Sequence, residues 1–216
     1  MLNGTAKPAA GLYPPEHPVS GTPKNHYTYD PARAKALLKE AGYGPGKPVK
    51  AKIMISTSGS GQMMPIPMNE FMQQNFKAVG MDIDFDVVEW GDHAGRHPRR
   101  SQGPAKPGVD GIAISLSSVD PSTMFRYYAI DSFSPTNYNW GHFASKAATA
   151  LLKQAQASFD PAEQTKLLAK AHAIVIDEAA WLFMVHDLKP RAMSKKVKDF
   201  QPVQSWFVDL TTISMA

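Results

Sequence analysis

The sequence predicts an α/β fold, and three observations support this prediction. Residues 49–55 alternate apolar side chains with lysines, a pattern typical of a strand. Residues 68–79 carry apolar side chains at helical spacing and end at Gly80. Residues 81–87 alternate again, this time with aspartates. A strand, a helix and a strand within about forty residues form a βαβ unit, which predicts that the two strands are parallel.

A first helix is predicted ahead of this unit, within residues 27–44. Asp30 suits the N-cap, and Pro31 suits the first helical position, where its missing N–H is not needed. Gly42 provides a left-handed stop. The helix marks the start of a folded domain, and four apolar residues at i, i+3, i+4 and i+7 form one apolar stripe: Ala34, Leu37, Leu38 and Ala41.

The second half of the chain continues the mixture of helices and strands. Asp120-Pro121 and Asp160-Pro161 each favour a helix start, and Glu163 is placed to complete a capping box with Asp160. The expected elements are a strand over 109–118, a short helix over 120–129, an irregular stretch over 130–143, helices around 148–155 and 161–174, a buried strand over 181–187 and short strands after Pro190.

Composition excludes several classes of function. The 216 residues are 43% hydrophobic, which is enough for a core, and the net charge of +4 is mild. A nucleic-acid-binding protein would concentrate more basic charge on one face. The absence of cysteine excludes disulfides, thiolate metal sites and cysteine nucleophiles. No apolar run approaches the ~20 residues that a membrane span needs. Residues 1–26 contain no apolar core of a signal peptide, so none is expected in this chain.

Five segments occur in an order that resembles the C-terminal half of the family 5 extracellular solute-binding proteins, the dipeptide, oligopeptide and nickel receptors of ABC importers. They are "YDPARAKALLKEAGY", "NFKAVGMDIDFDVVEW", "DPSTMF", "NYNWGHF" and "ALLKQAQASFDPAEQTKLLAKAHAIVIDEAAWLFMVHD". Each segment alone is weak, but their order and spacing are specific. The resemblance covers roughly residues 24–210.

The resemblance implies lobe II of a two-lobed periplasmic-binding-protein-like fold of the peptide-receptor class. We expect an extended arm or linker over residues 1–26, the α/β lobe over 27–180 and a segment returning toward lobe I over 181–216. Members of this family are about twice as long, so the chain is expected to be a truncated or split form of a receptor. The implied partners are a small-molecule or short-peptide ligand, the missing N-terminal lobe I and the ABC permease subunits, with no nucleic acid and no cofactor. The full receptor is expected in the periplasm or outside the cell, attached to the membrane.

Ligand-facing residues are expected on loops at one end of the sheet of this lobe, since α/β sheets bind ligands at the carboxyl ends of their strands. The predicted set combines hydroxyls, an amide and an indole: Ser58, Ser60, Ser117, Ser118, Asn139 and Trp140. The chemistry predicts a largely neutral contact surface. For Trp140 two alternatives stay open: the ring stacks on a ligand, or it packs with Tyr138 beneath its loop.

Other candidate sites have plainer explanations. His93 and His97, with Asp92, have a metal-ligand spacing, but Gly95 and Pro98 disfavour a helix there, so surface histidines and no metal are expected. The aspartates of the second strand share a face, but same-face neighbours lie ~7 Å apart, so a solvated face is expected for Asp82, Asp84 and Asp86.

The basic loop is predicted to be a solvated charge run, and its charges are Arg96, Arg99, Arg100 and Lys106. An alternative function is a small α/β enzyme that acts on an acidic substrate through residues 93–106. His172 is expected to be a satisfied core or boundary histidine. His186 and Asp187 are neighbours on a strand and would point to opposite faces, which argues against a catalytic dyad.

Overall fold

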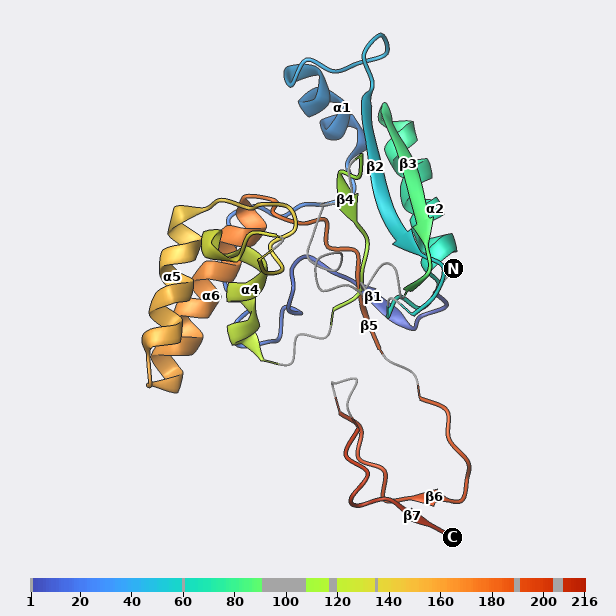
Figure 1. Cartoon of the computed structure of the whole chain (residues 1–216), viewed down its shortest axis with the longest axis vertical. Helices are drawn as coiled ribbons and strands as arrows, with labels where there is room; N and C mark the ends of the chain where they lie inside the picture. The colour runs from blue at the N-terminus through green and yellow to red at the C-terminus, as the bar shows by residue number, and fades with distance from the viewer. Residues whose placement is uncertain are drawn as a thin grey trace.

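The computed structural model describes residues 2–59, 61–90, 108–116, 120–134, 136–188, 191–203 and 208–216. A small sheet with helices α1 and α2 lies at one end of the molecule, a cluster of helices α4, α5 and α6 lies beside it, and the C-terminal segment extends away from both (Figure 1). The fold is therefore α/β, as the sequence predicts.

Helix α1 spans Pro31–Glu40 and begins and ends as expected. The carboxylate of Asp30 accepts a hydrogen bond from the N–H of Arg33 at 2.9 Å, and Gly42 takes a φ of +82°. The apolar stripe of α1 is not packed on a core. No residue of the helix is buried, and Leu37 is 52% exposed, because α1 lies at the end of the sheet (Figure 1) and not across it.

The predicted βαβ unit is confirmed. Strand β2 (Val49–Ser56) and strand β3 (Met81–Val88) pair in parallel, with helix α2 (Pro65–Ala78) between them in sequence. Helix α2 begins earlier than the predicted spacing over 68–79, and its two prolines occupy the first turn, where N–H groups have no partner within the helix.

The third strand is much shorter than the sequence predicts. Only Gly111–Ile112 (β4) pairs with β2, again in parallel, so the sheet order is β3-β2-β4. Two further hydrogen bonds extend the pairing, from the Asp110 N–H to the Lys52 carbonyl at 2.8 Å and from the Ala113 N–H to the Met54 carbonyl at 3.0 Å.

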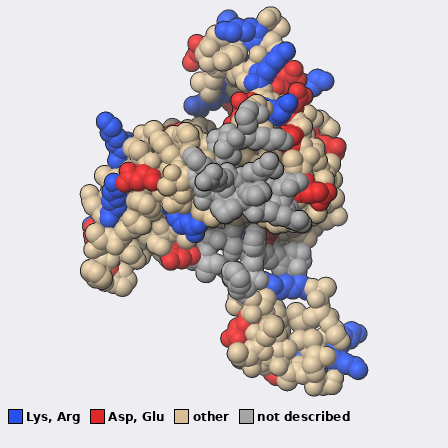
Figure 2. All heavy atoms as spheres, viewed as in Figure 1, with Lys and Arg blue, Asp and Glu red and all other residues tan. Residues whose placement is uncertain are grey.

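One face of the sheet is polar along the first half of β2 and β3. The register places Lys50 opposite Asp82 and Lys52 opposite Asp84, and both aspartates are exposed. Opposite charges across a strand pair are favourable. The expected solvated face is confirmed for Asp82 and Asp84, whereas Asp86 is only partly exposed. Acidic and basic side chains are interspersed on the surface shown in Figure 2.

The helical cluster contains most of the core. It consists of the 3-10 helix η1 (Pro121–Thr123), α4 (Met124–Tyr128), the 3-10 helix η2 (Ile130–Ser132), α5 (Lys146–Ala157) and α6 (Pro161–Asp177). Leu152 of α5 and Leu168 and Val175 of α6 are buried between these helices. The side chains of Asp120, Ser145 and Asp160 cap η1, α5 and α6.

The predicted capping box at the start of α6 was wrong. The N–H of Asp160 donates to the hydroxyl of Ser158 at 3.3 Å, so Glu163 has no N–H to accept there. Glu163 instead forms an exposed ion pair with Lys166 one turn along the helix, at 3.3 Å.

The N-terminal segment pairs with β5 and packs on the helical cluster. Strand β1 (Ala6–Pro8) pairs antiparallel with β5 (Val185–Asp187), which is shorter and less buried than the predicted strand over 181–187. Tyr13 and Val19 are buried in the helical core, so part of the expected arm packs onto the fold.

The last strands, β6 (Val197–Lys198) and β7 (Ser214–Met215), form a separate antiparallel ribbon, seen at the bottom of Figure 1. The expected boundaries after residues 26 and 180 stay predictions. None of the helices in the described ranges is both long and apolar enough to cross a membrane.

Candidate functional site

The carboxyl ends of β2 and β3 lie at the same edge of the sheet, because the strands are parallel and pair up to Ser56 and Val88. The Thr57 N–H donates to the Val88 carbonyl at 3.1 Å, which keeps the two chains together beyond the strands. The Thr57 hydroxyl then donates to the carboxylate of Glu89 at 3.3 Å. The hydroxyl of Ser56 is buried and has no hydrogen-bond partner among the described residues. We call Ser56–Gly59 together with Glu89 and Trp90 the carboxyl edge.

A close contact between Gly59 and Trp90 shapes the carboxyl edge. Gly59 has a φ of +78°, and a Cβ atom at this position would lie 2.7 Å from the Trp90 ring. Only glycine permits both this backbone conformation and this approach. The half-buried indole of Trp90 therefore rests directly on the loop that follows β2.

The structure places only half of the predicted ligand-facing residues. Ser58 is exposed at the carboxyl edge. Ser60, Ser117 and Ser118 lie outside the described residues. Asn139 and Trp140 belong to the segment between η2 and α5, within the helical cluster.

Asn139 is fully buried, and within the described part of the chain its amide bonds to backbone groups. Its Nδ2 donates to the carbonyls of Ala129 at 3.0 Å and Phe143 at 2.8 Å. Its Oδ1 accepts from the Phe143 N–H at 2.9 Å. These bonds connect the two ends of the irregular stretch, so the observed role of this side chain is to hold the loop together.

Trp140 is 8% exposed and lies within a cluster of aromatic rings. Its ring stacks on Tyr127 with centroids 6.1 Å apart and on Trp181 at 6.2 Å, and it meets Tyr138 edge-on at 5.6 Å. Arg126 lies over the outer face of Tyr138, 4.3 Å from the ring centroid. This geometry supports the packing alternative, and ligand contact by Trp140 stays a prediction.

The histidines and acidic residues of the described chain do not form a metal centre. No group of three or more potential ligands comes together among the described residues. His172 is fully buried with both ring nitrogens hydrogen-bonded, which confirms the expected core role. His93, His97 and the basic loop lie outside the described residues.

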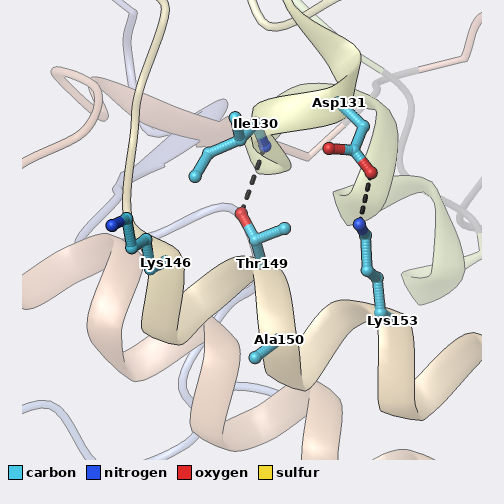
Figure 3. A pocket seen from close by; sticks show the side chains of 6 residues that line it. All are labelled: Ile130, Asp131, Lys146, Thr149, Ala150 and Lys153. Carbon is cyan, nitrogen blue, oxygen red and sulfur yellow. Dashed lines mark hydrogen bonds and ion pairs between the residues drawn. The ribbon is translucent and has the colours of Figure 1, made fainter.

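A shallow cavity of about 290 Å³ lies between η2 and the first turns of α5 (Figure 3). The Ile130 N–H donates to the Thr149 hydroxyl at 3.1 Å across it, and Lys153 forms an ion pair with Asp131 at its rim. None of its lining residues belongs to the sheet or was predicted to face a ligand.

Sequence reasoning missed Glu89 and Trp90. A signal was available, because both residues follow directly on a predicted strand, as Ser58 follows on the neighbouring one. The parallel register brings them to the same edge as Thr57 and Gly59.

Comparison with known proteins identifies relatives of this chain. Residues 1–134 match the family described as "Bacterial extracellular solute-binding proteins, family 5 Middle". The di/tripeptide-binding protein 2 of Pseudomonas aeruginosa (strain UCBPP-PA14) is 26% identical over 204 residues, covering 93% of this chain and 36% of the relative. The glutathione-binding protein GsiB of Escherichia coli (strain K12) is 28% identical over 201 residues, covering 91% of this chain and 38% of the relative.

Solved structures show the same fold. A dipeptide-binding protein from Pseudoalteromonas sp. SM9913, in complex with Met-Leu, superposes with a TM-score of 0.78 at 20% identity, over 99% of this chain and 41% of that one. The periplasmic binding protein DppA from Helicobacter pylori, in complex with the peptide STSA, gives a TM-score of 0.70 at 21% identity, over 99% and 40%. The chain thus spans well under half the length of these relatives.

Proposed function

The chain belongs to the bacterial extracellular solute-binding proteins of family 5, and from this membership we propose that it supplies one lobe of the solute-binding protein of an ABC importer. In this proposal the receptor binds a peptide-like or other small polar organic solute between two lobes. Closure of the lobes then presents the loaded receptor to the membrane permease. The chain carries out no chemistry on its ligand and works in the periplasm or outside the cell.

The family match over residues 1–134 is the observation that carries this proposal. The matched segment contains the whole β3-β2-β4 sheet and its carboxyl edge. Ligands of open α/β sheets bind beyond the carboxyl ends of the strands, where the chain leaves regular structure and can be shaped for recognition. We therefore assign the ligand-facing wall of this lobe to the carboxyl edge.

The chemistry of that wall suits a ligand with an amino group. Its described polar groups are the hydroxyls of Thr57 and Ser58 and the carboxylate of Glu89. Glu89 is exposed, and no cation among the described residues lies within ion-pair distance of it. A carboxylate held by one hydroxyl can accept further hydrogen bonds from an ammonium group. The contact surface is then less neutral than the sequence predicts.

Peptide ligands fit these groups and agree with the relatives, whose names specify di- and tripeptides and glutathione. The ammonium group of a short peptide would face Glu89, and the Trp90 indole beside it would cover the apolar part of the ligand. An exposed ion pair of this kind contributes about 0.2–1 kcal/mol, or up to about fivefold in affinity.

Titration of the ¹⁵N-labelled chain with Ala-Ala, followed by NMR, tests the proposal. One wall of a closed site binds weakly, so we expect a dissociation constant on the order of millimolar and shifts of the amides of Thr57, Ser58 and Glu89. N-acetylated Ala-Ala, which lacks the ammonium group, should bind less tightly. The variant Glu89→Gln should bind the free and acetylated peptides equally.

The variant Glu40→Gln is the matched control, because Glu40 is an exposed carboxylate at the last residue of α1, which precedes the amino end of β2. It should keep the preference for the free peptide. Shifts confined to other parts of the chain would refute the site. Stoichiometric micromolar binding by this chain alone would refute its role as a single wall. Hydrolysis of the peptide during the titration would favour the enzyme alternative.

A further inference from the structure

Residues 11–27, which we call the strap, cross helix α6 and are fixed to it by the imidazole of His172. The Leu12 N–H donates to Nε2 of His172 at 2.9 Å. A backbone N–H is always a donor, so Nε2 must be unprotonated and the proton of the neutral ring must sit on Nδ1. Nδ1 then donates to the Ser20 carbonyl at 2.7 Å. One ring thus joins two points of the strap that lie eight residues apart.

The strap approaches α6 too closely for side chains at two positions. A Cβ atom at Gly11 would lie 2.8 Å from the His172 ring. A Cβ atom at Gly21 would lie 2.2 Å from the Ala169 carbonyl, and Gly21 has a φ of +71°. The strap is therefore seated on the helix backbone, with His172 between its two glycines.

A second anchor lies at the end of α6. The Asn25 N–H donates to the Asp177 carboxylate at 2.7 Å, and the Asn25 side-chain amide donates to the Asp177 carbonyl at 3.0 Å. The Tyr27 hydroxyl donates to the same carbonyl at 2.9 Å. These bonds are exposed to solvent and involve no imidazole, so His172 is the imidazole anchor that joins the strap to α6.

We propose that the strap is an acid-released clasp: neutral His172 holds residues 11–20 on α6, and protonation of the ring opens this part of the strap. A proton on Nε2 would face the Leu12 N–H, so a hydrogen bond would be replaced by two opposed donors. The ring is fully buried, and a buried charge without a partner is strongly unfavourable. Release of the strap lets water reach the ring. This removes both the opposition of the two donors and the cost of the buried charge.

The surroundings of the ring oppose its positive charge. Burial is the main cause that lowers the pKa of His172 below its ordinary value of 6.5, and the bond to the Ser20 carbonyl offsets part of this effect. The titratable groups that face the ring are His17 on the strap and His186 on β5, and both lower its pKa further. Tyr13 meets the ring edge-on at 5.6 Å. Among the described residues, no carboxylate shifts the pKa of His172. Glu16 and Asp187 instead affect the pKa of His186.

The direction of the pH effect follows from these shifts. The released ring titrates near 6.5 and the clasped ring at a lower pH, so the released state takes up a proton first as the pH falls. The clasp is complete above about pH 6.5. Between that pH and the lower pKa of the clasped ring, opening becomes about tenfold more favourable for each pH unit.

Hydrogen exchange of the strap amides tests the clasp. At about pH 7.5 the Leu12 amide should be protected, and at about pH 5, after correction for intrinsic chemistry, its protection should fall by roughly tenfold for each unit within the window. The variant His172→Gln is neutral at both values and should lose this pH dependence. His26→Gln is the matched control, since His26 is an exposed histidine of the same strap, and it should keep the acid-induced loss.

An NMR titration of the imidazole protons keeps the test decisive if His172→Gln does not fold. In the unsubstituted chain, His172 should titrate below 6.5, and the Leu12 amide should lose protection over the same pH range. The proposal is overturned if strap protection is equal at the two pH values, if His172→Gln retains the acid-induced opening, or if His172 titrates at its ordinary value.

Discussion

Replacement of Asn139 by alanine is expected to be among the most damaging single changes in this chain. The side chain is fully buried, and its amide satisfies the carbonyls of Ala129 and Phe143 and the N–H of Phe143. Alanine would leave all three backbone groups without that partner. A buried group that loses its hydrogen bond costs about 1–3 kcal/mol, and water entering the vacated space recovers part of this. We expect a loss of about 3–5 kcal/mol in the free energy of unfolding.

Urea denaturation followed by circular dichroism measures this loss, and two further variants identify its cause. Asn139→Asp preserves the volume but places a carboxylate oxygen against two carbonyl oxygens, so it should be as damaging as alanine at pH 7. Asn137→Ala is the control, because Asn137 is only partly buried and its amide reaches the Ser132 hydroxyl at 3.4 Å. That change should cost no more than about 1 kcal/mol.

Two results would contradict the reasoning. If Asn139→Ala and Asn137→Ala were equally mild, the three hydrogen bonds of Asn139 would not control the loop. If Asn139→Asp kept full stability at pH 7, the amide group would not be required as a donor. A ligand-contacting role for Asn139 instead predicts that affinity falls while the unfolding curve stays unchanged.

Three further changes test separate contacts. Gly21→Ala forces a side chain onto the Ala169 carbonyl at a positive φ, and thermal unfolding should show a loss of about 2 kcal/mol or more. Tyr128→Phe removes a fully buried hydroxyl that has no hydrogen-bond partner among the described residues, so stability should be unchanged or rise by about 1 kcal/mol; a clear loss would reveal a hidden partner. Gly59→Ala should displace the Trp90 ring, which a change in tryptophan fluorescence would report without global unfolding.

Local patterns in the sequence predicted the parts of the fold that depend on neighbouring residues. Period-two and helical spacing located β2, α2 and β3, and the helix that connects the two strands favoured parallel pairing. The Asp-Pro pairs located three helix starts, because the capping hydrogen bond involves only the next two or three residues. These features need no knowledge of distant segments.

The features that local patterns did not reveal involve contacts between residues far apart in the chain. The α1 stripe is left uncovered, and nothing in a helix sequence states whether another element covers it. The strap lacks periodicity, and nothing in its sequence indicates its contacts with α6, which connect residues more than 150 positions apart. The amide-rich stretch suggested recognition; the amide of Asn139 closes a loop, and its contact with a ligand stays a prediction.

For Trp140 the sequence left both ligand stacking and packing open, whereas its contacts with distant residues support packing. Its substitution is the last prediction. The ring lies between Tyr127 and Trp181 and is 8% exposed, so Trp140→Ala should lower the free energy of unfolding by about 3–5 kcal/mol. Trp140→Phe keeps an aromatic ring there and should recover much of that loss. A loss below about 1 kcal/mol for the alanine variant would refute the packing role.

Ligand binding by a receptor that contains both lobes would decide the remaining question for Trp140. If the ring also contacts ligand, the phenylalanine variant should bind more weakly, by about 0.5–1.5 kcal/mol, although it folds well. If that variant binds normally, Trp140 acts only by supporting the cluster that holds Tyr138 and Arg126 at the surface. The recognition chemistry of this lobe would then lie at the carboxyl edge, where Glu89 and Thr57 meet at the ends of two parallel strands.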